Sequence, residues 1–189
     1  MIVRDLAIPG VKEIVPARHG DARGFFSETW NRVVLAGSGV DLDFVQDNHS
    51  MSAARGVLRG LHFQVPPFAQ DKLVRVVRGS IYDVAVDIRE GSPSFGQWVG
   101  LVVSAEAWNQ ILVPKGFAHG FVTLEPDCEV IYKVTAPYSP EHDRGIAHDD
   151  PALAIDWPVA ASERTLSDKD RAAPRLAAIE SPFSYGAAV

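Results

Sequence analysis

Apolar and polar residues alternate in short runs along most of this chain, and glycine and proline separate the runs. Runs of this kind occupy residues 72–78, 81–89, 98–104 and 129–135 and are rich in valine and isoleucine. Period-two alternation with turn residues between the runs is typical of β-strands, not of helices. The pattern therefore predicts an all-β sandwich or barrel, with residues 1–189 forming a single domain.

Gly79 and Ser80 link two of these predicted strands. A two-residue link with glycine first is typical of a type II′ turn, so the sequence predicts a hairpin between residues 72–78 and 81–89. The second strand then has an apolar face and an acidic face, with Tyr82, Val84, Val86 and Ile88 on the first and Asp83 and Asp87 on the second.

Residues 56–79 place Arg59, His62 and Lys72 among apolar, strand-forming residues. Holding such groups there costs desolvation energy, which a fold tolerates when they bind an anionic or carbonyl-bearing ligand. The alternative is that Arg59 and Lys72 end in solvent and His62 is a hydrogen-bonded core histidine. Strict alternation puts Arg59 on the opposite face from His62, so either a bulge intervenes or one of them points away from the pocket.

An earlier segment combines an aromatic ledge with two charges: Phe25, Phe26 and Trp30, with Arg23 and Glu28 beside them. One interpretation is a loop with a hydrophobic plug. The other is the lip of a ligand site, in which the arginine binds phosphate and an aromatic face packs on a base or sugar.

Other predicted strands offer polar groups for a ligand. Gln46, Asn48 and Ser50 share one face by period two, as hydrogen-bonding groups of a site or of an exposed strand would. His119 lies between glycines and phenylalanines in GFAHGF, and Tyr132 puts a hydroxyl on an otherwise apolar strand face.

Near the end of the chain, Ser167 and Asp170 fit a helix-capping box, with the serine as N-cap. A short helix is expected there, limited by Pro174. Asp170 therefore has a purely structural explanation.

The composition of the chain argues against several classes of function. The net charge of −6 argues against a nucleic-acid-binding domain, although a local cluster of Arg and Lys can still bind a small anion. The single cysteine, Cys128, excludes an intramolecular disulfide framework and a Cys-based zinc site. No signal-like segment or membrane-length apolar run occurs, so no membrane partner and a cytoplasmic location are expected.

These residue types suit proton transfer next to a ketone. His62 can act as the base because imidazole titrates near neutral pH. Lys72 can stabilise the enolate oxygen in a dry cavity, and Tyr132 can return a proton from the opposite face. A carboxylate on the other imidazole nitrogen would fix the tautomer of His62, and spacing alone does not identify that carboxylate.

A metal site is the competing interpretation. Double-stranded β-helix proteins often bind a divalent metal through an H-x-H pair, a later glutamate and a final histidine. GLHFQ supplies only His62 where a pair is needed, so no metal is expected.

Seven segments of the chain, taken together, resemble the family of dTDP-4-dehydrorhamnose 3,5-epimerases. The matching segments run in family order from about residue 21 to 170 and are DARGFFSETW, QDNHS, GVLRGLHFQVPPFAQDKLVRVVRGSIYDVAVDIR, GFAHGF, YKVTAPYSP, DDPALAIDWP and LSDKD. The resemblance implies a cupin-type jelly roll (a double-stranded β-helix) with a few short peripheral helices. It also implies an enzyme without metal or other cofactor, a homodimer, and a thymidine-diphosphate keto sugar as substrate.

The resemblance also implies roles for residues. His62 resembles the catalytic base, Asp170 its carboxylate partner, with Asp168 as the close competitor, Tyr132 the acid, and Lys72 the group at the keto oxygen. Further pocket residues by resemblance are Arg59 near the diphosphate, His119, Gln46, Asn48 and Tyr138. Arg23, Phe26 and Glu28 match residues that reach the nucleotide from the partner subunit.

Two alternatives accompany this hypothesis of inversion at both C3 and C5. Relatives that invert only C3 or only C5 of a related nucleotide-linked 4-keto-6-deoxysugar share the same base and acid. A metal-dependent or non-catalytic cupin is the third possibility. His148 and the pair Trp108-Asn109 depart from the family pattern, which bears on the choice of nucleotide and sugar.

Overall fold

The computed structural model describes residues 1–186 and consists mainly of short antiparallel strands. The strands are β1 (Ile2–Asp5), β2 (Lys12–Val15), β3 (His19–Asp21), β4 (Gly24–Phe26), β5 (Gln46–Ser52), β6 (Leu58–Gln64), β7 (Lys72–Arg78), β8 (Ser80–Asp87), β9 (Trp98–Ser104), β10 (Gln110–Val113), β11 (Phe117–Thr123), β12 (Cys128–Val134) and β13 (Asp143–Gly145). The helices are α1 (Arg32–Ala36) and α2 (Asp168–Arg171), with 3-10 turns η1 (Ala161–Glu163) and η2 (Leu176–Ala178). The single-domain expectation for the whole chain stays a prediction.

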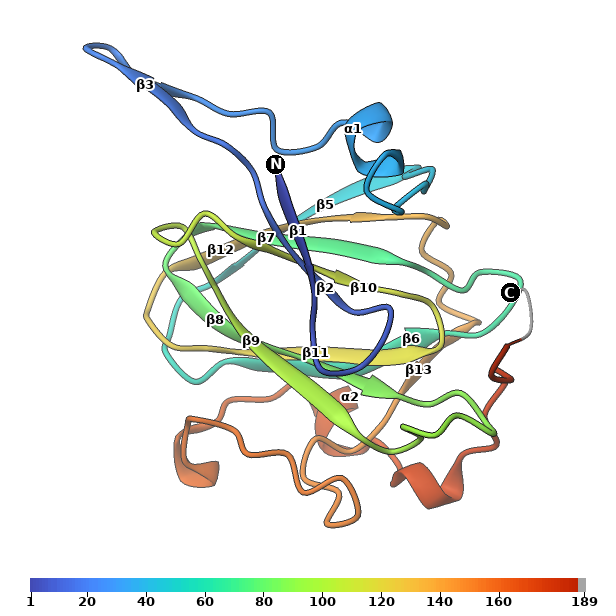
Figure 1. Cartoon of the computed structure of the whole chain (residues 1–189). Helices are drawn as coiled ribbons and strands as arrows, with labels where there is room; N and C mark the ends of the chain where they lie inside the picture. The colour runs from blue at the N-terminus through green and yellow to red at the C-terminus, as the bar shows by residue number, and fades with distance from the viewer. Residues whose placement is uncertain (187–189) are drawn as a thin grey trace.

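Two sheets face each other in the body of the molecule (Figure 1). The larger has the order β1-β2-β10-β7-β12-β5, and the smaller has the order β13-β6-β11-β8-β9. From β5 to β8 and again from β10 to β13, successive strands fall in alternate sheets. This winding confirms the predicted jelly roll with short peripheral helices. Strands β3 and β4 form a separate two-stranded arm that projects from the body (Figure 1).

The predicted hairpin at Gly79 is wrong. Strand β7 belongs to the six-stranded sheet and β8 to the five-stranded sheet, so the chain changes sheets at this glycine instead of folding back on itself. Gly79 has a φ of +78°, and a Cβ there would lie 2.6 Å from the Sγ atom of Cys128. The position thus needs glycine for both its backbone angle and its close packing. A glycine in a turn predicts that the chain changes direction, but it does not specify which strand the following strand pairs with.

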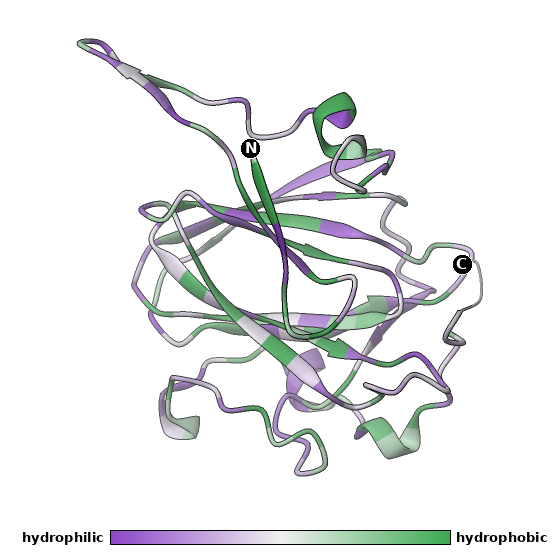
Figure 2. Cartoon of the chain, in the orientation of Figure 1, coloured by the Kyte–Doolittle hydropathy of each residue, from purple (hydrophilic) through white to green (hydrophobic). Residues whose placement is uncertain are grey.

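Apolar side chains pack in three layers. A central cluster lies between the sheets and includes Val74, Ile81, Ile111, Phe117 and Val130. A second covers the outer face of the five-stranded sheet, where Leu61 and Val84 pack against Trp157 and Phe183 of the C-terminal segment. A third places Leu35 of α1 on Ile14, Leu73 and Leu112 of the six-stranded sheet. Figure 2 shows hydrophobic and hydrophilic residues interleaved along the strands of both sheets.

Both faces of the five-stranded sheet are therefore covered, and this decides where the acidic face of β8 points. Val84 and Val86 pack outward, under the C-terminal segment. Ile81 and Ala85 pack inward, between the sheets, and period two puts Asp83 on that same inner face. A strand read from sequence as half apolar and half acidic thus turns its acidic side toward the interior.

Both short helices have a side-chain N-cap, and the cap of α2 is the one that the sequence predicts. In α1 the side chain of Asn31 accepts a hydrogen bond from the Val34 backbone amide. In α2 the Ser167 side chain accepts one from the Asp170 backbone amide. Such caps satisfy amides that the first turn leaves unpaired, and α2 begins directly after its predicted N-cap. Within residues 1–186, no helix has the length and apolar character that crossing a membrane requires.

Candidate active site

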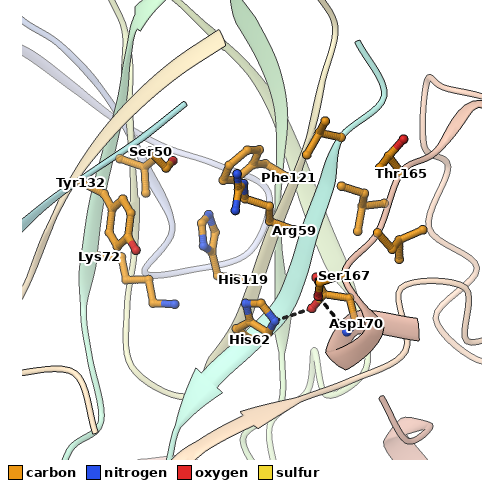
Figure 3. A pocket seen from close by; sticks show the side chains of 14 residues that line it. Ser50, Arg59, His62, Lys72, His119, Phe121, Tyr132, Thr165, Ser167 and Asp170 are labelled. Carbon is orange, nitrogen blue, oxygen red and sulfur yellow. Dashed lines mark hydrogen bonds and ion pairs between the residues drawn. The ribbon is translucent and has the colours of Figure 1, made fainter. Parts of the chain in front are cut away.

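A cavity of about 480 Å³ opens between the two sheets (Figure 3). Six of the residues predicted for the site line it, namely Arg59, His62, Lys72, His119, Tyr132 and Asp170. Strands β6 and β11 of one sheet and β7 and β12 of the other supply five of them, and α2 supplies the sixth. Groups from both sheets therefore face one enclosed space.

A β-bulge in β6 brings Arg59 and His62 to the same face. His62 lies opposite His119 on β11, and Arg59 lies opposite Phe121, with a register shift between the two pairs. The extra residue on β6 reverses the alternation, so both side chains line the cavity. Gly60 at this shift has a φ of +113°, and a Cβ there would lie 2.6 Å from backbone atoms of β11. The bulge thus depends on glycine.

The imidazole of His62 is held by a carboxylate from the far end of the chain. Its Nε2 atom lies 2.6 Å from Oδ1 of Asp170, which is 5% exposed, while the His62 side chain is 30% exposed. The Ser167 hydroxyl donates to Oδ2 of the same carboxylate at 2.7 Å. Asp168, the competing candidate, lies fully at the surface beside Arg171. The geometry therefore pairs His62 with Asp170, and Asp170 also belongs to the helix cap.

The surroundings of Asp170 favour its ionised form. Burial on its own would raise the pKa of this carboxyl, but the hydrogen bonds from His62 and Ser167, aided by the charge of Lys169, lower it below its usual range. An ionised carboxylate accepts the Nε2–H of His62 and leaves Nδ1 as the ring nitrogen with a free lone pair. Asp170 thus selects the tautomer that a base needs.

A second histidine–carboxylate pair lies at the cavity wall, and only its histidine lines the space. Nε2 of His119 is 2.9 Å from both oxygens of Asp83, and Asp83 is completely buried. His119 is among the site residues predicted from the sequence, whereas Asp83 is not. The signal was present, because Asp83 is one of two acidic residues in a strand whose other residues are mostly apolar and buried. A buried carboxylate of this kind needs a hydrogen-bonded partner.

Lys72 and Tyr132 stand on the wall opposite the two histidines (Figure 3). Burial lowers the pKa of the Lys72 ammonium to about 8, although the charges of Asp143 and Asp83 oppose the shift. Burial raises the pKa of the Tyr132 hydroxyl, and nearby Arg59 partly counteracts this. At neutral pH the site therefore presents a cation and a protonated phenol.

A smaller, adjoining cavity of about 120 Å³ contains the other predicted contacts from the same chain. Gln46 and Asn48 line it from β5, joined by a 2.7 Å hydrogen bond. The backbone amide of Tyr138 donates to Oε1 of Gln46 at 3.0 Å. Because His62, Lys72 and Tyr132 line this cavity too, the two spaces form one continuous site.

Comparison with known proteins identifies this arrangement. The sequence model of the family described as dTDP-4-dehydrorhamnose 3,5-epimerase matches residues 5–178. A protein of that name from Sinorhizobium fredii is 50% identical over 185 residues, which cover 98% of this chain and 94% of the relative. The chain belongs to the dTDP-4-dehydrorhamnose 3,5-epimerase family.

Solved epimerase structures share the fold. RmlC from Legionella pneumophila, in complex with dTDP-4-keto-L-rhamnose, superposes with a TM-score of 0.93 at 46% identity and covers 98% of this chain and 99% of its own. A 3′-monoepimerase from Streptomyces bikiniensis, in complex with dTDP-quinovose, has a TM-score of 0.85 at 35% identity and covers 91% of this chain and 86% of its own. Epimerases of different regiochemistry therefore share this architecture.

In this family member, Arg23, Phe26 and Glu28 do not line the chain's own cavity. Arg23 and Phe26 belong to the β3–β4 arm and its turn, Glu28 follows the arm, and all three side chains are exposed. The phenyl ring of Phe25 packs edge-on against Trp108 at 4.8 Å. Trp108, one of the departures from the family pattern, thus supports the base of the arm.

The metal alternative requires a cluster of ligands. Within residues 1–186, no group of three or more His, Cys, Asp or Glu side chains is placed to hold a metal ion. His62 and His119 instead each direct Nε2 to a carboxylate of their own, Asp170 and Asp83. These residues fit acid–base chemistry better than metal ligation.

Proposed function

We propose that this chain inverts C3 and C5 of dTDP-4-dehydro-6-deoxyglucose to give dTDP-4-dehydrorhamnose. Family membership and about half-identical relatives of that name support the reaction. The observation that carries the proposal is the 2.6 Å contact between His62 and Asp170 at the edge of a cavity that Tyr132 lines from the other sheet. A base and an acid that face one bound ring from opposite sides are what inversion at carbon requires.

In the proposed reaction, Nδ1 of His62 removes the proton from a carbon next to the C4 ketone. The Asp170 carboxylate stabilises the imidazolium that forms, because its lowered pKa keeps it ionised. The protonated Lys72 lies where it can stabilise the enolate oxygen in a partly desolvated cavity. Tyr132 then donates its phenolic proton to the opposite face of the carbon. The ring turns and the sequence repeats at the second carbon.

Substrate binding follows the same proposal. Arg59 lies beside the cavity with its guanidinium on Ser52 and the Met51 carbonyl, a position suited to the diphosphate. His119, Gln46, Asn48 and Tyr138 would contact the sugar from the walls of the two adjoining cavities.

We also propose a homodimer in which the arm of one chain completes the site of the other. The arm projects from the body (Figure 1), and its guanidinium and phenyl groups are exposed. Arg23 would contact phosphate, Phe26 would stack on the base, and Glu28 would accept hydrogen bonds from the nucleoside. The molar mass in solution, measured by light scattering, tests the assembly.

The reaction is tested in heavy water with dTDP-4-dehydro-6-deoxyglucose as substrate. Every proton returned to carbon then comes from an exchanged acid, so deuterium is expected at both C3 and C5, with product of the rhamnose configuration. NMR or mass spectrometry locates the label. Label at one carbon only would assign the chain to the monofunctional relatives, and loss of activity on chelation would favour a metal-dependent cupin.

A further inference from the structure

Two successive inversions on one bound sugar require that the base and the acid return to their starting protonation states, and these two groups alone cannot do so. After the first inversion His62 holds one proton more than at the start, and Tyr132 holds one fewer. The second inversion needs a neutral imidazole and a protonated phenol again. A proton must therefore return to Tyr132, and one must leave His62, while the sugar is still bound. This requirement rests on the proposed function.

Asp143 occupies the position from which such a proton can be delivered. It begins β13, directly opposite Gln64 of β6, and its side chain is only 11% exposed. Its Oδ2 atom accepts a hydrogen bond from the Tyr138 hydroxyl at 3.2 Å and forms an ion pair with Nζ of Lys169. A single carboxylate oxygen thus joins a phenol at the cavity to an ammonium group at the surface.

The cavities place this network next to Tyr132. Asp143 and Tyr138 line the 120 Å³ cavity together with Tyr132 and Lys72. Asp143 and Lys169 also line an outer hollow of about 340 Å³ that reaches His62 from the other side. The network therefore runs from solvent at Lys169 to the space that the Tyr132 hydroxyl shares with substrate.

The charge distribution favours return of the proton. Burial raises the pKa of Tyr132, and the nearby carboxylate of Asp143 raises it further. A phenolate formed at Tyr132 is therefore a strong proton acceptor beside a chain of donors. The Tyr132 hydroxyl has no hydrogen-bond partner among the side chains and backbone groups of residues 1–186, so it is free to receive one.

We propose that Asp143, with Tyr138 and Lys169, forms the path that reprotonates Tyr132 between the two inversions. The Tyr138 hydroxyl turns to Tyr132 and gives up its proton, and Asp143 passes a proton from Lys169 to Tyr138. Lys169 recovers its proton from water, and His62 releases the proton taken from carbon to water. Each inversion then leaves the enzyme in its starting protonation state, with no net gain or loss of protons.

The test is a single-turnover experiment in heavy water with enzyme in excess over dTDP-4-dehydro-6-deoxyglucose. The first inversion starts with His62 neutral and Tyr132 protonated, so it needs no returned proton. Asp143→Asn should therefore keep the wild-type rate of the first inversion. The second inversion should slow by about tenfold, so that singly inverted, singly labelled sugar accumulates. The ratio of the second rate to the first does not depend on how much of the variant is folded.

Two further variants complete the design. Tyr138→Phe removes the hydroxyl at a position that is already 57% exposed. It should lower the ratio of the second rate to the first, whatever its effect on sugar binding. Asp168→Asn changes another carboxylate beside Lys169 that lies at the surface of α2, and it should leave the ratio unchanged.

Adding imidazole buffer separates proton delivery from mere positioning of Tyr138. A small protonated buffer can reach the cavity and replace a missing proton path, so it should restore the second inversion in Asp143→Asn. An unchanged ratio in that variant would overturn the proposal, as would a lowered ratio that no buffer concentration restores. A wild-type enzyme that exchanges neither carbon would instead refute the proposed function itself.

Discussion

The two histidine–carboxylate pairs of this cavity have the same ring geometry and different surroundings. Both rings present Nε2 to a carboxylate, at 2.6 Å for His62 and 2.9 Å for His119. The His62 side chain is 30% exposed, whereas that of His119 is 10% exposed and its partner Asp83 is fully buried. Both rings thus reach the space where substrate would bind, but His62 is the more exposed, and the carboxylate behind His119 is enclosed between neighbouring strands.

The difference also lies in how each carboxylate is supported. Asp170 comes from a one-turn helix and accepts a second hydrogen bond from Ser167, so it can hold His62 without being part of a sheet. Asp83 lies in β8, which pairs directly with the β11 strand of His119. A histidine–carboxylate contact alone therefore does not identify a base. The greater exposure of His62 and the support of Asp170 from outside the sheet distinguish the proposed catalytic pair from one that also holds two strands together.

The largest expected effect is a loss of activity on substitution of His62. His62→Ala should lower kcat by about a thousandfold, because it removes the proposed general base, and it should abolish deuterium exchange at both carbons. Nucleotide affinity should change little. Exchange measured by NMR and dTDP affinity measured by calorimetry provide the two readouts.

His119→Ala is the matched control for that prediction. Its loss should weaken binding and stability more than it affects the proton-transfer step. If exchange survived in His62→Ala and vanished in His119→Ala, the roles of the two pairs would have to be reversed.

The next effect concerns stability. Asp83→Ala leaves the enclosed His119 without its partner, and breaking a buried pair of this kind lowers the free energy of unfolding by about 3 kcal/mol. Asp170→Ala affects only a one-turn helix and a half-buried imidazole, so a loss of about 1 kcal/mol is expected. Urea denaturation of both variants measures the difference. Equal losses would show that the two pairs contribute alike to the fold.

The smallest effect is a pH dependence that Lys72 adds to the site. Burial lowers its pKa to about 8, so the ammonium is charged below that pH and neutral above it. Because the charged form is the one proposed to stabilise the enolate, kcat/KM should fall as the pH rises through about 8. A pH–rate profile measures this limb. Lys72→Met should be slower throughout and should lack the limb, and a limb that persisted would belong to another group.

Local patterns predicted several of the strands, a shared face on β5 and the cap of α2. Period-two alternation placed Gln46 and Asn48 on one face, and the Ser167–Asp170 box marked the start of α2, as observed. These features depend on residues a few positions apart, whose geometry is set by the backbone. The resemblance to the epimerase family named the candidate residues, and six of them line one cavity.

What sequence alone determined is thus several of the strands, which side chains share a face where alternation is unbroken, and the types of groups available for chemistry. The tertiary structure decided the partners: Asp170 over Asp168 for His62, Asp83 for His119, the bulge that turns Arg59 inward, and the change of sheet at Gly79. The physical reason is the separation along the chain of the residues that interact. Alternation and capping act over a few residues, whereas His62 and Asp170 are 108 positions apart and meet only when two sheets and a C-terminal helix pack together.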